Sequence, residues 1–153
     1  ITIGKVVDKG IDDGNNMGAA MAPAAVDTIY SYFEDTKDDP KSFDLIATGD
    51  LGQLGKKITA DLLRQRGIDI FDVYTDCGLE IFDLEQQDVH CGGSGCGCIS
   101  LVAMGYVVDC LKKGIYNKVL LIATGALMNP IMVAQNETIP AIAHAVVLER
   151  SNL

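Results

Sequence analysis

Residues 90–98, with the sequence HCGGSGCGC, hold the densest set of residues in the chain that could do chemistry. Glycine lets the backbone approach a ligand closely and adopt positive φ angles. A helix is predicted to begin directly after this stretch, and the free N–H groups and positive dipole end of a helix start attract anions. We therefore expect a carboxylate or phosphate to bind at Gly92, Gly93, Ser94 and Gly95, with Ser94 as the helix N-cap. The alternative interpretation is close packing of a helix on a sheet, where glycine makes room.

Two other chemistries are open to the same stretch. Cys91, Cys96 and Cys98 could hold a metal together with His90, but zinc sites usually pair their ligands as Cys-x2–4-Cys and need a second pair. Cys77 is the one plausible extra ligand. A thiolate nucleophile needs a neighbouring base, yet His90 and Cys91 are adjacent in sequence, which rarely places two side chains face to face. We predict neither a metal site nor a catalytic pair.

Two predicted strands end in the same dipeptide, Thr-Gly. The sequence LIATG occurs at residues 45–49 and again at residues 121–125. In open α/β sheets, ligands bind beyond the carboxyl ends of the strands. Thr48, Gly49 and Thr124 therefore join the candidate ligand site. The alternative is coincidence, because buried strands use few residue types.

Other polar segments have structural interpretations. Asp50 follows the first Thr-Gly and could be a base, a cation ligand or the N-cap of the next helix; we favour the cap and keep Asp50 in the candidate site. His144 lies in the last predicted strand and is expected to be a satisfied core residue. Residues 38–39 are an acidic pair that we expect in a solvated loop. Residues 129–140 lack a clear period and could cover the ligand crevice.

The composition excludes several classes of function. Lys and Arg total 12 and Asp and Glu total 21, so the formal net charge is −9. A chain this acidic repels phosphate backbones, which argues against nucleic acid as a partner. The five cysteines are an odd number and no secretory signal opens the chain, which favours reduced thiols over a disulfide framework. The longest uncharged run, residues 89–108, contains a histidine and several glycines, which argues against a transmembrane segment.

The elements that must position these residues alternate between strands and helices. Strands are predicted at residues 1–11, 43–47, 118–123 and 141–149, and one more element is predicted as two short strand pieces, at residues 73–75 and 79–82. Helices are predicted from residue 22 to 33 with Pro23 in the first turn, from 51 to a stop at Gly67, and from the glycine-rich stretch to a stop at Gly114. The order β-α-β-α-β-α-β-β predicts a layered α/β sandwich with a mainly parallel mixed sheet. The last helix is apolar nearly all round, which is typical of a helix buried inside a larger body.

Six motifs along the chain resemble the stage V sporulation protein AD family of the thiolase-like superfamily. They lie at residues 16–25, 48–52, 76–79, 92–98, 124–127 and 139–146. The resemblance covers almost the whole chain and corresponds to the C-terminal half of such proteins. It implies that residues 1–153 are a single domain, one α/β half of a thiolase-like fold. We therefore expect Ile1 to mark a cut and the apolar helix to meet a missing N-terminal half.

The resemblance also implies a role in endospore formers. Proteins of this family belong to the apparatus that moves dipicolinic acid, alone or with calcium, into the developing spore and out at germination. This chain would be a soluble, ligand-binding member beside the stage V sporulation A membrane subunits, peripheral to the spore inner membrane. We expect no cofactor other than calcium bound together with dipicolinate. We also expect a homodimer or larger assembly if this half is studied by itself.

The chain departs from the enzymes of the thiolase-like superfamily. Those enzymes take a nucleophilic Cys from the N-terminal half, and His and Asn, or two His, from the C-terminal half. Residues 48–50 (TGD) stand where a ketoacyl synthase carries its histidine, and residues 92–94 (GGS) where it carries its asparagine. His90 matches a thiolase histidine only with a one-residue shift. A developing oxyanion would have no stabiliser and a proton no acceptor, so we predict a binding module with no catalytic residues. The alternatives are an acyl-transferring enzyme, with Cys91 or Cys96 as nucleophile and His90 as base, and a purely structural interaction subunit.

Dipicolinate is a planar dicarboxylate, and the predicted site would meet it with backbone N–H groups and hydroxyls. The predicted ligand-binding residues are Thr48, Gly49, Asp50, Gly92, Gly93, Ser94, Gly95 and Thr124. The net charge of −9 opposes long-range attraction of a dianion. The site would therefore need local donors, or calcium bound with the ligand.

Overall fold

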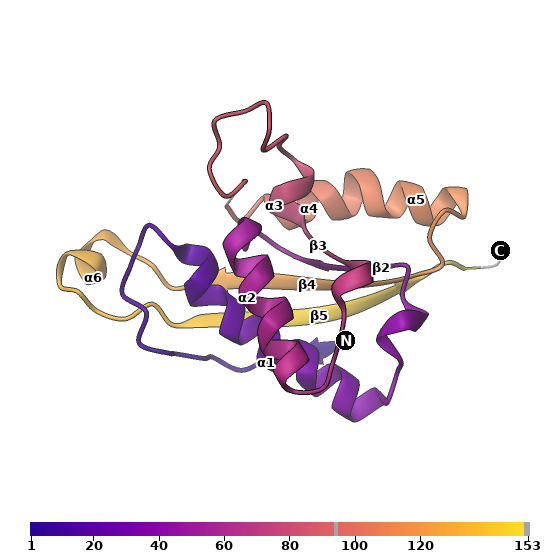
Figure 1. The fold of residues 1–153 in the computed structure, drawn as a ribbon, viewed down its shortest axis with the longest axis horizontal. Coiled ribbons are helices and arrows are strands. Elements are labelled where there is room, and N and C mark those ends of the chain that lie inside the picture. The colour runs from indigo at the N-terminus through magenta and orange to yellow at the C-terminus, as the bar shows by residue number, and fades with distance from the viewer. Residues whose placement is uncertain (94, 152–153) are drawn as a thin grey trace.

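A five-stranded β-sheet, in the order β1-β5-β4-β2-β3, forms the centre of the computed structural model, which describes residues 1–93 and 95–151 (Figure 1). The strands are β1 (Thr2–Ile3), β2 (Leu45–Thr48), β3 (Tyr74–Asp76), β4 (Lys118–Ala126) and β5 (Ala141–Glu149). β2 pairs in parallel with β3 and β4, whereas β5 pairs antiparallel with β4 and β1. The predicted α/β class with a mixed sheet is confirmed. The carboxyl ends of β2, β3 and β4 meet at one edge of the sheet.

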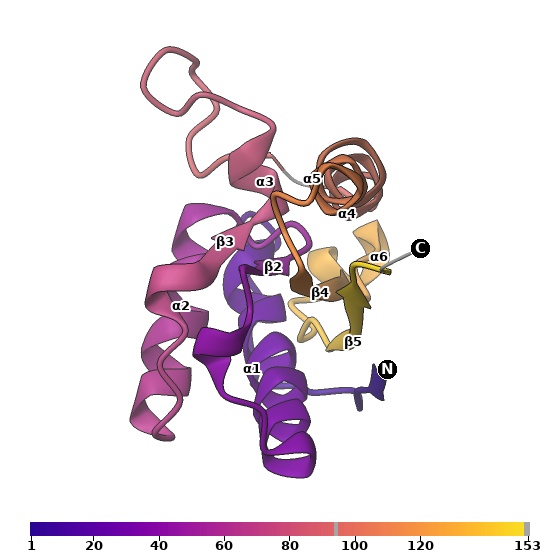
Figure 2. The same ribbon diagram turned by 90° about the vertical axis from the view of Figure 1, so that its right-hand side faces the viewer.

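Helices cover both faces of this sheet (Figure 2). One face carries α1 (Met17–Thr36) and α2 (Gly52–Gln65); the other carries α4 (Cys98–Val102), a π turn (Ala103–Val107) and α5 (Val108–Lys113). Successive residues of a strand point to opposite faces. Ile46 and Leu120 therefore join the core under α1 and α2, while Ala47 and Leu121 join the core under α4 and α5. Burial on both faces explains why these strands read as continuous apolar runs.

Helix α1 begins at Met17, ahead of the predicted start. The side chain of Asn16 accepts a hydrogen bond from the backbone N–H of Ala19 at 3.3 Å and caps the helix. Pro23 lies inside the helix, so the prediction that it occupies the first turn was wrong. A good cap and the strong helix propensity of the Ala- and Met-rich residues 17–22 outweigh the hydrogen bond that proline removes.

The N-terminal strand is shorter than the predicted range of residues 1–11. Thr2–Ile3 pair with β5, and Val7 forms an isolated bridge with Ala141. The carboxylate of Asp8 accepts a hydrogen bond from the N–H of Gly10 at 2.9 Å. This Asx-type turn ends the extended segment.

The strand predicted at residues 79–82 was also wrong. Helix α3 (Cys77–Glu80) stands there instead. The Asp76 side chain accepts a hydrogen bond from the N–H of Gly78 at 3.0 Å and caps this helix. The cap turns the chain away from the sheet directly after β3.

The helix that contains α4 and α5 has the predicted extent and stops at Gly114, which has φ +71°. It packs one face against the sheet through Val102 and Val107. Its other face is open in this chain: the exposed fractions of Leu101 and Met104 are 63% and 69%. The expectation that this face meets a missing N-terminal half stays a prediction. Among the described residues, none of the helices combines the length and apolar character needed to cross a bilayer.

Two further segments, the end of α2 and residues 129–140, lie outside the strands of the sheet. Gly67 follows α2 with φ +83°, as the predicted helix stop requires. The segment 129–140 contains a short helix that was not predicted, α6 (Pro130–Ala134). Asn129 caps it by accepting a hydrogen bond from the N–H of Met132 at 2.9 Å.

Candidate functional site

Asp76, the last residue of β3, holds together the loops at the carboxyl edge of the sheet. Its side chain is fully buried. One carboxylate oxygen, Oδ2, accepts hydrogen bonds from the Thr48 hydroxyl at 2.6 Å and the Leu51 N–H at 2.9 Å. The other, Oδ1, accepts from the N–H groups of Gly52 at 2.9 Å and Gly78 at 3.0 Å. Burial raises the pKa of Asp76, and these four hydrogen bonds offset part of the rise.

Asp50 forms a second link, between the glycine-rich loop and β4. Its Oδ2 accepts a hydrogen bond from the N–H of Gly95 at 2.9 Å, and its Oδ1 accepts from the hydroxyl of Thr124 at 2.9 Å. We predicted that Asp50 caps α2, and this prediction was wrong. The N–H groups at the start of that helix are taken by Asp76, and Leu51 stands at the N-cap position without a side-chain hydrogen bond.

The glycine-rich loop packs tightly against these strand ends. The N–H of Gln53 donates to the carbonyl of Cys91 at 2.7 Å, and the N–H of Gly93 donates to the carbonyl of Gly78 at 2.8 Å. A Cβ atom on Gly93 would lie 2.6 Å from the ring atom Cε2 of Phe82, and one on Gly92 would lie 3.0 Å from the carbonyl oxygen of Gly78. Close packing therefore accounts for part of the glycine content, as the alternative interpretation proposed. Helix α4 begins at Cys98 with Gly97 at the N-cap position, and the predicted cap, Ser94, lies outside the described residues.

A cleft of about 560 Å³ opens beside this arrangement. It is lined by Asp13, Gly14, Asn15, Asn16, Met17, Gly18, Asp50, Leu51, Gly52, Leu54, Cys91, Gly92, Gly93 and Met128. Of the predicted site residues, Asp50, Gly92 and Gly93 line the cleft. Gly95 and Thr124 are not among the lining residues, but both donate hydrogen bonds to Asp50. These lining residues include two carboxylates and no Lys, Arg or His.

Thr48 and Gly49 support the cleft from inside the protein. Thr48 is fully buried, and its hydroxyl lies 3.0 Å from the Tyr74 hydroxyl and donates to Asp76. The structure thus corrects the prediction that this hydroxyl faces a ligand. A Cβ atom on Gly49 would lie 2.7 Å from the Thr124 hydroxyl oxygen, so glycine is needed there for close approach.

Comparison with known proteins places the chain in a family. The family model of stage V sporulation protein AD (SpoVAD) matches residues 1–149. The chain belongs to this family. Stage V sporulation protein AD of Bacillus subtilis (strain 168) is 47% identical over 150 residues, which cover 98% of this chain and 44% of that protein. The chain thus spans less than half the length of this curated relative. The crystal structure of 3-oxoacyl-(acyl-carrier-protein) synthase III from Aquifex aeolicus VF5 aligns with a TM-score of 0.46 at 13% identity, over 99% of this chain and 52% of that one.

The five thiols of this SpoVAD-family chain differ in their exposure to solvent. Cys77, Cys98 and Cys110 are buried, whereas Cys91 and Cys96 are exposed, and all five are free. Burial raises the pKa of Cys77 to about 12 and also raises that of Cys98. Among the described residues, no group of three or more His, Cys, Asp or Glu side chains gathers as a metal site would.

The two histidines lie on the surface. The side chain of His90 is 88% exposed, with Nδ1 3.9 Å from a carboxylate oxygen of Asp88. His144 is exposed and its Nδ1 accepts a hydrogen bond from the N–H of Gly4 at 3.1 Å, so the prediction of a core residue was wrong. Its neighbours Ala143 and Ala145 point into the core under α1, which directs His144 to the opposite face.

The acidic pair at residues 38–39, which we predicted in a solvated loop, forms hydrogen bonds within the protein. Asp38 accepts hydrogen bonds from Lys118 Nζ at 2.8 Å and from the Tyr32 hydroxyl. Asp39 accepts from the N–H of Lys41 at 2.9 Å and caps a single 3-10 turn. Both aspartates are thus structural.

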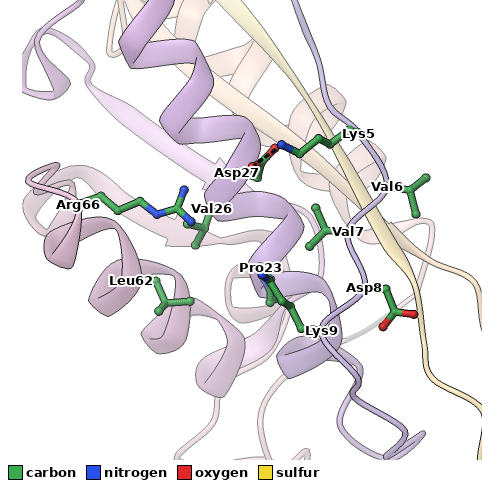
Figure 3. Close-up of a pocket in the computed structure, with 10 residues that line it drawn as sticks. All are labelled: Lys5, Val6, Val7, Asp8, Lys9, Pro23, Val26, Asp27, Leu62 and Arg66. Carbon is green, nitrogen blue, oxygen red and sulfur yellow. Dashed lines mark ion pairs between the residues drawn. The ribbon is translucent and has the colours of Figure 1, made fainter.

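A second depression, of about 570 Å³, lies away from the strand ends, between the N-terminal segment, α1 and α2 (Figure 3). Its lining includes three cationic side chains, Lys5, Lys9 and Arg66. Lys5 pairs with Asp27 at 3.1 Å, as the dashed line in Figure 3 marks. No predicted site residue lines this depression. The lining also includes two carboxylates, Asp8 and Asp27, so three cations outnumber two anions, and we call it the cationic depression.

Asp76 is the residue that sequence reasoning missed. It belongs to a motif that carries the family resemblance, yet it was not among the predicted site residues. A local signal was present: an Asp that ends a short strand, followed two residues later by Gly, is typical of a turn or helix cap. The remaining donors to Asp76 come from residues 24 to 28 positions away in sequence, which no local pattern reveals.

Proposed function

We propose that this chain is a non-catalytic, ligand-binding part of a stage V sporulation protein AD, and that its ligand is dipicolinate bound as the calcium complex. The observation that carries the proposal is the cleft at the carboxyl ends of the strands, which is lined by the glycine-rich loop and by two carboxylates. In this role the protein would serve the transport of dipicolinate into the spore and its release at germination.

The charge of the cleft favours the calcium complex over free dipicolinate. Asp13 and Asp50 line the cleft, and its lining includes no cationic side chain to balance a dianion. Calcium and dipicolinate together are neutral, and calcium prefers oxygen ligands such as carboxylates and carbonyls. Each Asp50 oxygen accepts one hydrogen bond, and a carboxylate oxygen has a second lone pair. Asp50 therefore keeps the capacity to bind a cation.

A binding role is also supported by the placement of the groups that acyl transfer would need. The raised pKa values of Cys77 and Cys98 keep these thiols protonated at neutral pH, and a protonated thiol is a poor nucleophile. At the end of β2, where a ketoacyl synthase would carry a histidine, Thr48 uses its hydroxyl on Asp76. Turnover of an acyl thioester by the full-length protein would contradict the non-catalytic proposal.

The open face of the helix α4–α5 suggests how the chain fits into a larger protein. We propose that the rest of the protein, its N-terminal half, covers Leu101 and Met104. The assembled protein would lie at the spore inner membrane, beside the stage V sporulation A membrane subunits. In a chain separated from that half, the same face would drive self-association.

Isothermal calorimetry of the full-length protein with calcium and dipicolinate tests the proposal. Leu54, on α2, lines the cleft and is 41% exposed, so Leu54→Trp fills the cleft without emptying the core. We expect Leu54→Trp to weaken affinity by about tenfold or more. Leu62→Trp is the matched control, because Leu62 lies on the same helix and lines the other depression. Equal affinity of Leu54→Trp and wild type would overturn the assignment of the cleft.

A further inference from the structure

The buried carboxylate of Asp76 forms more hydrogen bonds than the capping of α3 requires. Asp76 does not line the cleft, so it has no direct contact with a ligand there. Its four hydrogen-bond donors come from β2, the start of α2 and the start of α3. We propose that Asp76 is the positioning residue of the cleft, which holds the glycine-rich loop in its binding geometry through two separate arms.

The first arm runs through the start of α2. Asp76 accepts hydrogen bonds from the N–H groups of Leu51 and Gly52, both at 2.9 Å. The next N–H along the chain, that of Gln53, donates to the carbonyl of Cys91 at 2.7 Å. Gly52 has φ +63°, and a Cβ atom there would lie 2.6 Å from the same carbonyl oxygen. Asp76 therefore sets the position of the turn at residues 51–53, which binds the carbonyl of Cys91 through the N–H of Gln53.

The second arm runs through the turn from β3 into α3. Asp76 accepts a hydrogen bond from the N–H of Gly78 at 3.0 Å. The carbonyl of Gly78 accepts from the N–H of Gly93 at 2.8 Å. The two arms thus fix Cys91 and Gly93, which flank Gly92, and all three residues line the cleft.

The site requires an acceptor with two equivalent oxygens. Each Asp76 oxygen accepts two hydrogen bonds. An asparagine has one acceptor oxygen, and its NH2 group would face two donors in place of the second oxygen. Because Asp76 is fully buried, solvent water cannot reach the two donors and replace the lost acceptor. Asp76→Asn therefore breaks the hydrogen bonds at the base of one or both arms while keeping the size of the side chain.

Hydrogen exchange of the full-length protein tests the role of Asp76 without any ligand. The first arm loses a hydrogen bond in either orientation of the asparagine side chain, because Leu51 donates to one Asp76 oxygen and Gly52 to the other. In Asp76→Asn, we therefore expect the amide of Gln53 to exchange at least about tenfold faster than in wild type, and that of Gly93 also when the NH2 group replaces Oδ1. Amides in the β4–β5 ladder should keep their protection. Thr48→Val removes the donor that shares Oδ2 with Leu51 and should speed exchange at Gln53 by a smaller factor. It keeps the test available if Asp76→Asn does not fold.

Two controls separate positioning from a general loss of stability. Asp50→Asn replaces one of the two oxygens that accept from Gly95 and Thr124, and it should leave Gln53 and Gly93 protected to within about twofold. Asp38→Asn removes a carboxylate near the start of β4 and should also leave them protected. Unchanged exchange at Gln53 in Asp76→Asn, or faster exchange throughout the sheet, would overturn the assignment.

The effect on ligand binding rests on the proposed function. With calcium and dipicolinate as the probe, we expect Asp76→Asn to lose affinity by about tenfold or more, because the lining of the cleft is no longer held. If the wild-type protein binds no calcium dipicolinate, the proposed function is overturned, and the exchange of the Gln53 amide still decides the role of Asp76. If wild type binds and Asp76→Asn binds equally, the positioning role is overturned.

Discussion

At the scale of single residues, carboxylates with several partners hold the ends of the sheet. Asp38 joins the end of α1 to the start of β4, where Lys118 Nζ lies 2.8 Å from Asp38 Oδ2. The hydrogen bond from Lys118 and that from Tyr32 lower the pKa of Asp38. Burial and the contact with Asp38 raise the pKa of Tyr32 to about 12, so Tyr32 remains a donor at neutral pH.

The Asp38 contacts predict how stability depends on pH. The folded pKa of Asp38 lies below its ordinary value of 3.8, so its contribution to stability is present above that pH and is lost as pH falls through the folded pKa. The Asp38 side chain is 30% exposed, which limits its contribution to about 0.5–1 kcal/mol. Denaturant unfolding of Asp38→Asn should show this loss at pH 7 and a smaller difference from wild type near pH 3. A constant difference across that range would contradict the account.

The candidate site was predictable in part at this scale. Residue types alone pointed to Asp50 and to the glycines of residues 92–95, because a polar residue after a buried strand and a glycine-rich turn both have local signatures. They could not show that Asp76, rather than Asp50, holds the start of α2. That choice depends on which strand lies beside β2, and the pairing of Thr48 with Asp76 is a long-range fact.

At the scale of elements, glycine sets how closely α1 and α2 approach each other. A Cβ atom on Gly18 would lie 2.1 Å from the carbonyl oxygen of Leu51. A Cβ atom on Gly55 would lie 2.8 Å from the carbonyl oxygen of Gly18. The start of α1 therefore lies directly against the start of α2, beside the cleft.

A pair of glycine-to-alanine variants tests this close approach. Gly18→Ala must push α1 and α2 apart and should lower the free energy of unfolding by about 1–3 kcal/mol. Gly105 is the matched control, because it also lies within a helix and an added Cβ would meet no atom within 4 Å. Gly105→Ala should raise the free energy of unfolding by about 0.4–1 kcal/mol. Denaturant unfolding measures both, and equal effects of the two variants would contradict the packing argument.

The order of strands and helices was predictable because periodicity and apolar runs are local signals. The errors fall where a single side chain redirects the backbone. Asn16 starts α1 before Pro23, and Asp76 caps a helix at residues 77–80, which replaces the start of the strand predicted at residues 79–82. Such caps are decided by individual hydrogen bonds, and a hydropathy pattern does not contain them.

At the scale of the whole molecule, this chain presents an apolar face with no partner among its own described elements. Leu101 and Met104 on the helix α4–α5 are exposed, and Ala123 and His144 of the neighbouring strands line a shallow depression beside Met104. The chain covers 44% of its Bacillus subtilis relative, and we propose that the remainder of a full-length protein covers this face.

Self-association of the isolated chain follows from that open face. Residues 1–153 produced alone should form dimers or larger assemblies, and Met104→Glu should shift them toward monomer. Lys112→Glu, an exposed change on the same helix, should not. Light scattering measures each mass, and a clean wild-type monomer would contradict the expectation.

A crystal structure of the full-length protein with calcium and dipicolinate is the most direct test of the central claim. We expect the ligand in the acidic cleft, with calcium beside Asp50 and the dipicolinate ring against Gly92 and Gly93. Dipicolinate bound instead in the cationic depression, beside Lys9 and Arg66, would contradict the account. So would an empty cleft at a ligand concentration that saturates binding in solution.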